Sequence, residues 1–180
     1  MPKYVALLRA VNVGGNNMIK MDALKEMFQS LKFKNVATYI QSGNILFETI
    51  ETEEGKLLSK IEKEIAKVFG LQIDVFLRSE DEIITIIEDR PFKKVEGRED
   101  VKLNVSFLAA MPDAEQAEHF MSLSNEVDTF MLKGRELFTI TLKEAPKSLL
   151  SDALIKKHLK LKATTRNWNT TNKLHDLLKK

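Results

Sequence analysis

Residues 3–20 have the sequence KYVALLRAVNVGGNNMIK, and this stretch decides the fold of the first half of the chain. Apolar side chains occupy both alternations of residues 4–11, a pattern typical of a central β-strand that is covered on both faces. Arg9 interrupts this run, and a Gly-Gly loop follows it. From residue 21 onward, apolar residues recur at helical spacing. The stretch therefore predicts a buried strand, a polar loop at its end and an amphipathic helix.

The residues that follow predict a hairpin, a second helix and a further strand. Residues 36–47 alternate as two strands around a Ser-Gly-Asn turn. Residues 57–68 carry a helical apolar stripe that ends at Gly70, and residues 71–77 alternate as a strand. Residues 1–78 therefore have the element order βαββαβ, which is that of the ferredoxin-like split βαβ fold.

The second half of the chain predicts a similar order of elements. Ser79 and Glu82 have the spacing of a capping box at the start of a helix, and the charged residues 93–100 are the best candidate for a linker. A βαββα series and a last helix follow, although no repeat of individual residues is visible. We therefore predict an α+β fold of two tandem ferredoxin-like (split βαβ) halves with a C-terminal helix, and domains at residues 1–90 and 100–180.

Composition excludes few functions. The 180 residues include 28 basic and 26 acidic side chains, and the net charge of +2 is too small to indicate nucleic-acid binding by itself. Cysteine is absent, which excludes disulfides and thiolate metal sites. The start of the sequence has no signal-peptide pattern, and no apolar run has the length of a membrane span. We expect a cytoplasmic protein without membrane association, either a monomer or a weak homodimer.

Two loops of the first half are predicted to be neighbours. The first crossover of a split βαβ unit makes its first two strands parallel, so both strands end at the same edge of the sheet. Residues 12–17 should therefore lie close to residues 41–44. The Gly-Gly pair leaves backbone N–H groups free for an anion, while Arg9 and Lys20 add positive charge, so phosphate or carboxylate is the natural ligand. The equally weighted alternative is that both loops are ordinary turn chemistry.

A third polar segment, residues 163–170, has the sequence ATTRNWNT. The guanidinium of Arg166 and the indole of Trp168 suit clamping a phosphate and stacking on a base. The alternative is structural: Asn167 or Asn169 caps the last helix and Trp168 packs into the core. Arg166 has no such obvious structural role.

Several familiar sites are absent from the sequence. Neither a GxGxxG nor a GxxxxGK[ST] motif occurs, and residues 42–50 do not match the RNP1 pattern of RNA-recognition motifs. No catalytic triad or carboxylate pair is indicated by spacing. His119, His158 and His175 lie on charged predicted helices without a second ligand at metal spacing. We therefore predict no metal site and no cofactor.

Three segments carry a resemblance to a known family. LLRAVNVGGNN at residues 7–17, TYIQSGNILF at residues 38–47 and ATTRNWNT at residues 163–170 resemble, in order and spacing, the bacterial family called Domain of Unknown Function 1697. The resemblance covers nearly the whole chain. It implies a cytosolic bacterial protein with two related α+β halves, and it implies that the three segments belong to one shared site. It implies no particular activity.

The sequence thus leaves two functions open. The first is a binding module for a phosphate-containing ligand, a nucleotide or a nucleic acid, at a cleft formed by the three segments. The alternative is an enzyme that acts on a small phosphorylated or carboxylated metabolite, in which the same groups stabilise developing negative charge. The binding module is preferred because a general base or nucleophile is missing. The candidate ligand-binding residues are Arg9, Asn12, Gly14, Gly15, Asn16, Lys20, Gln41, Ser42, Gly43, Asn44, Thr165, Arg166, Asn167 and Trp168.

Overall fold

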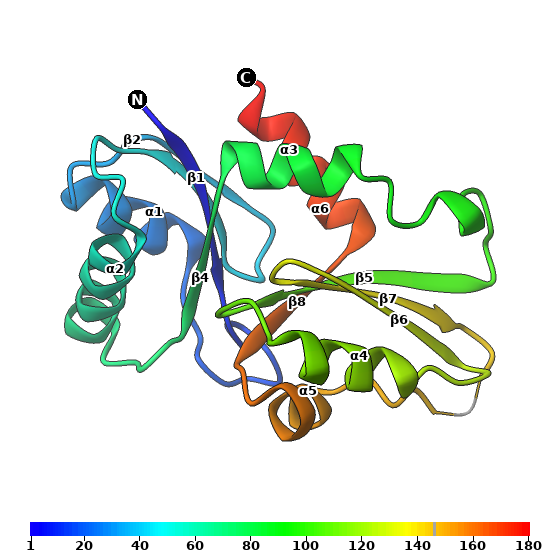
Figure 1. Cartoon of the computed structure of the whole chain (residues 1–180). Helices are drawn as coiled ribbons and strands as arrows, with labels where there is room; N and C mark the ends of the chain where they lie inside the picture. The colour runs from blue at the N-terminus through cyan, green and yellow to red at the C-terminus, as the bar shows by residue number, and fades with distance from the viewer. Residues whose placement is uncertain (146) are drawn as a thin grey trace. The chain divides into compact units, whose positions relative to one another are not determined.

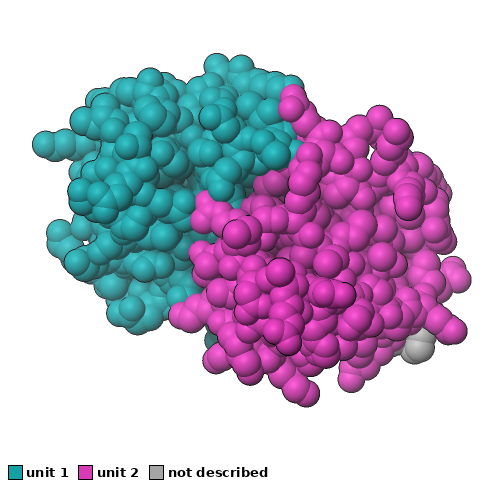
Figure 2. Space-filling view, in the orientation of Figure 1, with its two compact units in different colours: residues 1–85, 173–180 teal, residues 86–172 magenta. Residues whose placement is uncertain are grey.

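The computed structural model of the chain describes residues 1–145 and 147–180. These residues form an α+β structure with six α-helices and two four-stranded antiparallel sheets (Figure 1). They divide into two compact units, which Figure 2 colours separately: residues 1–85 with 173–180, and residues 86–172. The α+β class predicted from the sequence is confirmed, and the architecture is consistent with two similar halves.

The first unit is built around a four-stranded sheet. Its elements are β1 (Lys3–Leu8), α1 (Met21–Ser30), β2 (Lys34–Tyr39), β3 (Asn44–Glu48), α2 (Glu54–Phe69) and β4 (Val75–Ser79). The strand order is β2-β3-β1-β4, and each neighbouring pair is antiparallel. Helix α3 (Glu80–Glu88) begins in this unit, and the last residues of α6 (Trp168–Leu178) belong to it.

Strand β1 is buried on both faces, as its sequence predicts. Tyr4, Ala6 and Leu8 belong to the core cluster of this unit, together with the apolar stripes of α1 and α2. Both helices lie on the same side of the sheet in Figure 1. Val5 and Leu7 point to the opposite face, because side chains alternate along a strand, and they too are fully buried.

The predicted helix boundaries are set by local capping chemistry. Gly70 ends α2 in the left-handed conformation, with φ 67°. At the start of α3, the Ser79 N–H donates to Glu82 Oε2 at 2.8 Å, and the Glu82 N–H donates to Ser79 Oγ at 3.2 Å. These two reciprocal bonds form the predicted capping box.

The second unit has the same order of elements. They are β5 (Val101–Leu108), α4 (Ala114–Ser122), β6 (Asp128–Lys133), β7 (Glu136–Leu142), α5 (Asp152–Leu159) and β8 (Ala163–Asn167), preceded by the short 3-10 helix η1 (Lys93–Val95). The antiparallel strand order is β6-β7-β5-β8. Leu108, Phe120 and Ile155 represent its core, between the sheet and helices α4 and α5. Strand β8 is not predicted from the sequence.

The two units also repeat one another in hydrogen bonds. The N–H of Leu8, the last residue of β1, donates to the carbonyl of Gly43 at 2.8 Å. The N–H of Leu108, the last residue of β5, donates to the carbonyl of Arg135 at 2.9 Å. In each unit the bond joins the end of the first strand to the hairpin turn, so the halves share their detailed geometry.

Candidate functional site

The Gly-Gly loop, residues 9–20, is shaped by asparagine side chains. The Asn12 side chain donates from Nδ2 to the Ile19 carbonyl at 2.9 Å and accepts from the Ile19 N–H at 2.8 Å. Asn17 Nδ2 donates to the Ala10 carbonyl at 3.1 Å. These bonds close the loop on itself, so both amides have structural roles.

The tip of this loop is a tight turn with exposed backbone. Gly14 and Gly15 have φ values of 58° and 76°, and the Asn16 N–H donates to the Val13 carbonyl at 3.0 Å. Positive φ at two consecutive positions suits glycine. Within residues 1–145 and 147–180, the N–H groups of the two glycines have no hydrogen-bond acceptor. They remain available to an anion.

The hairpin turn after β2, with the sequence QSGN, contacts the Gly-Gly loop as the topology predicts. Asn12 Nδ2 donates to the Gln41 carbonyl at 2.8 Å. Gly43 lies directly against β1, because a Cβ placed on it would be 2.8 Å from the Cβ of Leu8. The structure therefore confirms that the two loops are neighbours.

The polar side chains of the QSGN turn mainly stabilise the turn itself. Asn44 is fully buried, and its Nδ2 donates to the Tyr39 carbonyl at 3.0 Å and to Ser42 Oγ at 2.9 Å. Gln41 is exposed. For Asn44 and Ser42 these bonds support the turn-chemistry alternative.

Arg9 has an acidic partner in the structure. Its Nη1 lies 3.3 Å from Asp74 Oδ2, and its backbone N–H donates to the Asp74 carbonyl at 3.0 Å. Both side chains are about a third exposed, so this is a partly solvated ion pair. Lys20 is exposed at the N-cap position of α1. The predicted strand runs to residue 11, but β1 ends at Leu8, so Arg9 lies just after the strand and is paired there with Asp74.

The third candidate segment forms β8 and the start of α6. Thr165 Oγ1 is hydrogen-bonded to Ser106 Oγ at 2.7 Å across the sheet. Arg166 is buried, and its Nη1 donates to Thr164 Oγ1 at 2.8 Å and to the Thr165 carbonyl at 3.0 Å. Burial lowers the pKa of Arg166 to about 10, so the guanidinium stays protonated at neutral pH.

Asn167 and Trp168 occupy the N-terminus of α6. Asn167 Oδ1 accepts the Thr170 N–H at 2.7 Å, which confirms the capping alternative for this residue. Trp168 is half-buried, and its ring meets Phe92 edge-on, with centroids 5.0 Å apart and an interplanar angle of 79°. The indole is therefore held in place while part of its surface stays open.

The predicted site residues are divided between the two units. The Gly-Gly loop and the QSGN turn belong to the first unit, whereas residues 165–168 belong to the second. A single cleft shared by all three segments stays a prediction.

The structure also reveals an arginine that the sequence analysis does not include. Arg78 on β4 pairs across the sheet with Val5, and Arg166 on β8 pairs with Val105. Each arginine is buried and donates Nη1 to the carbonyl of the residue before it, at 2.7 and 3.0 Å. Each directly precedes a helix-capping serine or asparagine. That shared Arg-cap pair is the sequence signal of the internal repeat.

Trp168 borders two pockets of the second unit, which we call the Trp168 pockets. One has a volume of about 680 Å³ and includes Phe92, Arg98 and Asn172 in its lining. The other has a volume of about 740 Å³, and Lys102 and Lys143 are in its lining. Arg98, Leu103, Trp168 and Asn169 line both. Both volumes lie within the range of about 300–1,000 Å³ that is usual for ligand sites.

The larger Trp168 pocket is rich in basic side chains. Arg98, Lys102 and Lys143 line it, against the single carboxylate of Glu99. Arg98 is hydrogen-bonded to Asp100, from Nε at 2.9 Å and from Nη2 at 2.5 Å, and this interaction lowers the pKa of that carboxyl. Lys102 and Lys143 are exposed. Two of the three basic side chains in the lining, Lys102 and Lys143, are thus exposed to solvent, while Arg98 is paired with a carboxylate.

Helix α6, whose first residues line this pocket, has no negatively charged side chain at its start. The first turn of α6 contains no acidic residue. The equivalent helix of the first unit, α3, begins with Glu80, Asp81 and Glu82. Carboxylates at this position complement the positive end of the helix dipole. The N-terminus of α3 is thus compensated by its own side chains, whereas that of α6 is not.

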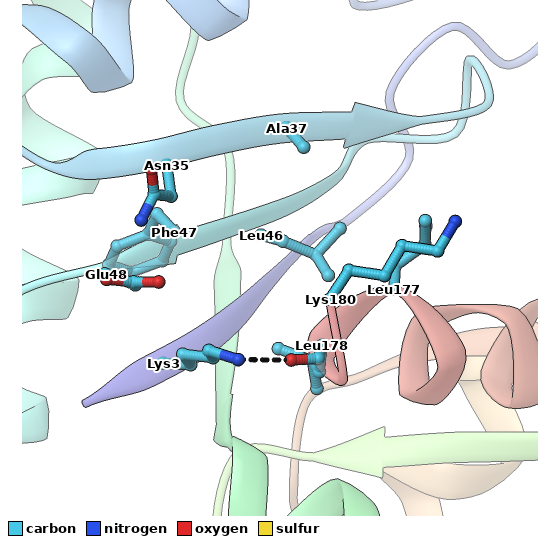
Figure 3. Close-up of a pocket in the computed structure, with 9 residues that line it drawn as sticks. All are labelled: Lys3, Asn35, Ala37, Leu46, Phe47, Glu48, Leu177, Leu178 and Lys180. Atoms are coloured by element: carbon cyan, nitrogen blue, oxygen red, sulfur yellow. Dashed lines mark hydrogen bonds between the residues drawn. The ribbon is translucent and has the colours of Figure 1, made fainter. Parts of the chain in front are cut away.

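A further pocket, of about 340 Å³, lies in the first unit (Figure 3). Residues of β1, β2 and β3 line it together with Leu177, Leu178 and Lys180, and none of the predicted site residues is among them. Lys3 Nζ donates to the carbonyl of Leu178 at 2.5 Å and lies 3.5 Å from Glu80 Oε1. A cation at the C-terminal end of a helix is stabilising, so Lys3 has a structural role here.

Two kinds of feature are absent from the described residues 1–145 and 147–180. These residues contain no group of three or more His, Asp or Glu side chains placed to hold a metal ion. None of their helices combines the length and the apolar character that crossing a membrane requires.

Fold and loops together define the class of protein: an α+β protein of two similar halves, each with a four-stranded antiparallel sheet. The chain belongs to the family described as protein of unknown function, DUF1697, whose model matches residues 1–138. This confirms the resemblance found in the sequence. The matched range contains the Gly-Gly loop and the QSGN turn and ends before β8.

Solved structures show the same fold. The chain is similar to the conserved bacterial protein SP0830 from Streptococcus pneumoniae, with 22% sequence identity, a TM-score of 0.76 and coverage of 98% of each chain. At this identity the similarity shows the fold alone. No curated protein matches the chain.

Proposed function

We propose that this protein is a binding module for a phosphate-containing ligand, a nucleotide that is either free or part of a single-stranded nucleic acid. In this proposal the base stacks on Trp168 and the phosphate lies at the N-terminus of α6. We also propose that both halves are ferredoxin-like, because each has the order βαββαβ with its first strand central in an antiparallel sheet.

The observation that carries the proposal is the position of Trp168. Its indole borders both Trp168 pockets, is half-exposed, and is fixed from one side by Phe92. A base that stacks on an aromatic side chain gains about 1–3 kcal/mol, whatever its identity. A preordered indole reduces the entropic cost of that contact. The side-chain amides of Asn169 and Asn172, which line the smaller pocket, supply polar groups for the edge of a base.

The phosphate position is supported by the charges of the larger Trp168 pocket. Asn167 caps the Thr170 N–H, but the first turn of α6 has no acidic residue, so the positive end of the helix dipole is not neutralised by a carboxylate. Lys102 and Lys143 are exposed and line the same pocket. An exposed ammonium group in the same pocket as a helix N-terminus is suited to a phosphate rather than to a neutral ligand.

The Gly-Gly loop is proposed as a separate anion contact in the first unit. Gly14 and Gly15 present backbone N–H groups that no acceptor in the described residues occupies, and Asn16, Lys20 and Gln41 are exposed. A short run of free N–H groups is a typical anion cradle.

Intrinsic fluorescence tests the proposal directly, because Trp168 is the only tryptophan in the chain. We expect ADP or a short single-stranded RNA to quench its emission, because a base would stack on the indole. Inorganic phosphate, which has no base, serves as the comparison and should quench it less. By calorimetry, Trp168→Ala should weaken binding about 5- to 150-fold, which corresponds to the loss of one stacked base. Lys102→Ala and Lys143→Ala should each reduce the salt dependence of RNA binding by about one counterion.

The matched control is Lys63→Ala, which removes an exposed lysine of α2 in the first unit and should leave binding unchanged. The absence of any response to ADP, RNA and phosphate at millimolar concentration would overturn the proposal. Binding of a sugar phosphate without any response to nucleotides would favour the enzymatic alternative.

A further inference from the structure

Two histidines that lie 39 positions apart in the sequence meet in the second unit. His119 is in the last turn of α4 and His158 is in the last turn of α5. His119 Nε2 lies 3.2 Å from His158 Nδ1, and the ring centroids are 5.2 Å apart. The two helices run along the same face of the second sheet (Figure 1). His119 is exposed and His158 is half-buried, so the pair is accessible to solvent.

We propose that His119 and His158 together bind one divalent transition-metal ion, such as Zn²⁺ or Cu²⁺, with water in the remaining coordination positions. Imidazole nitrogens bind Zn²⁺ at about 2.0–2.1 Å, so two of them at a tetrahedral angle lie about 3.3–3.4 Å apart. The separation of 3.2 Å is close to that value. A rotation that turns both ring nitrogens from each other toward one ion would therefore convert the His-His hydrogen bond into a chelating pair without separating the helices.

The protonation state of His158 suits a metal ligand. Burial lowers the pKa of His158, and the charges of His119, Lys157 and Lys160 lower it further. A histidine must be neutral to bind a metal ion, and a lowered pKa keeps His158 neutral at pH 7. The same two lysines repel a cation, and no third His, Asp or Glu among the described residues completes the site. We therefore expect weaker binding than at a closed structural zinc site.

A metal ion bound by this pair would connect two separate helices. Its two ligands come from different helices, so a bound ion would link α4 to α5 and oppose their separation. Metal binding should therefore raise the thermal unfolding temperature of the protein, because an ion that binds only the folded state stabilises it. This stabilisation should disappear when either histidine is replaced.

Calorimetric titration of the full, untagged chain with Zn²⁺ at pH 7.5 tests the proposal. We expect one ion per chain, with an affinity that falls at least about tenfold in His119→Gln and in His158→Gln. His119 is exposed, so its variant should fold normally and is the decisive one. Lys157→Gln should strengthen binding, since it removes a positive charge that acts on His158.

The matched control is His175→Gln, which replaces the third histidine of the chain and should leave Zn²⁺ affinity unchanged. With Cu²⁺ as the probe, the electron paramagnetic resonance spectrum should show two coordinated imidazole nitrogens in the wild type and one in either variant. No Zn²⁺ binding, or binding that His119→Gln leaves unchanged, would overturn the proposal and leave the pair as a hydrogen bond between helices.

Discussion

Replacing Gly43 with alanine tests how the QSGN turn is held against β1. Gly43 has φ 78°, and a Cβ at this position would lie 2.8 Å from the Cβ of Leu8. In the left-handed conformation an alanine lowers the free energy of unfolding by about 1–2 kcal/mol, and overpacking against Leu8 lowers it by about 1–3 kcal/mol more. Because alanine has fewer conformations than glycine in the unfolded chain, about 0.4–1 kcal/mol is regained. We therefore expect Gly43→Ala to lower the free energy of unfolding by about 2–4 kcal/mol.

Gly15 provides a matched control within the neighbouring loop. Its φ of 76° is almost the same, but a Cβ placed on it meets nothing within 4 Å. Gly15→Ala carries the same backbone strain and the same unfolded-state gain, so its net loss should be about 1 kcal/mol. The difference between the two variants isolates the contact with Leu8, which should amount to about 1–3 kcal/mol.

Urea unfolding followed by circular dichroism measures both values. The expected result is a lower midpoint for Gly43→Ala than for Gly15→Ala, with the same slope for both. Equal losses to within about 0.5 kcal/mol would refute the reasoning, because the turn would then not be in close contact with β1.

Three further predictions concern other polar groups of the structure. Asn12→Ala removes three hydrogen bonds and should lower the free energy of unfolding by about 2–4 kcal/mol. Asn17→Ala removes one and should lower it by about 1 kcal/mol, and urea unfolding measures both variants. Asp128→Asn should cost about 2–4 kcal/mol, because this buried carboxylate accepts three hydrogen bonds; a loss below about 1 kcal/mol would contradict its structural role. Burial, together with nearby positive charge, lowers the pKa of His158 from 6.5, so the stability it contributes is present above pH 6.5 and is lost as the pH drops below 6.5 and through the lower pKa of the folded state. His158→Gln should flatten this fall, as measured by thermal unfolding between pH 7.5 and pH 5.

Elements that follow from local physics were predictable from the sequence. The apolar alternation of β1, the stop at Gly70 and the Ser79–Glu82 capping box all appear in the structure as predicted. The contact between the Gly-Gly loop and the QSGN turn also followed, because the crossover makes β1 and β2 parallel and the loops after them therefore share an edge of the sheet.

Strand β8 could not be recognised from the sequence. Thr164, Thr165 and Arg166 form its centre, so it lacks the apolar alternation that marks the other strands. It is a strand because it pairs with β5, and that pairing joins residues about 60 positions apart in the chain. Contacts between residues that are far apart in the chain, such as this pairing and the ion pair of Arg9 with Asp74, cannot be predicted from the spacing of residues in the sequence.

The internal repeat gives the strongest argument about the site. Helices α3 and α6 begin at equivalent positions, each after an edge strand that carries a buried arginine. The fold therefore does not require their first turns to differ. Each carboxylate in the first turn of a helix is worth about 0.3–1 kcal/mol, and α3 has three of them, whereas α6 has none. The α6 sequence thus forgoes stabilisation that its counterpart uses. A local departure of this kind is expected where the first turn of a helix is kept without carboxylates beside an anion.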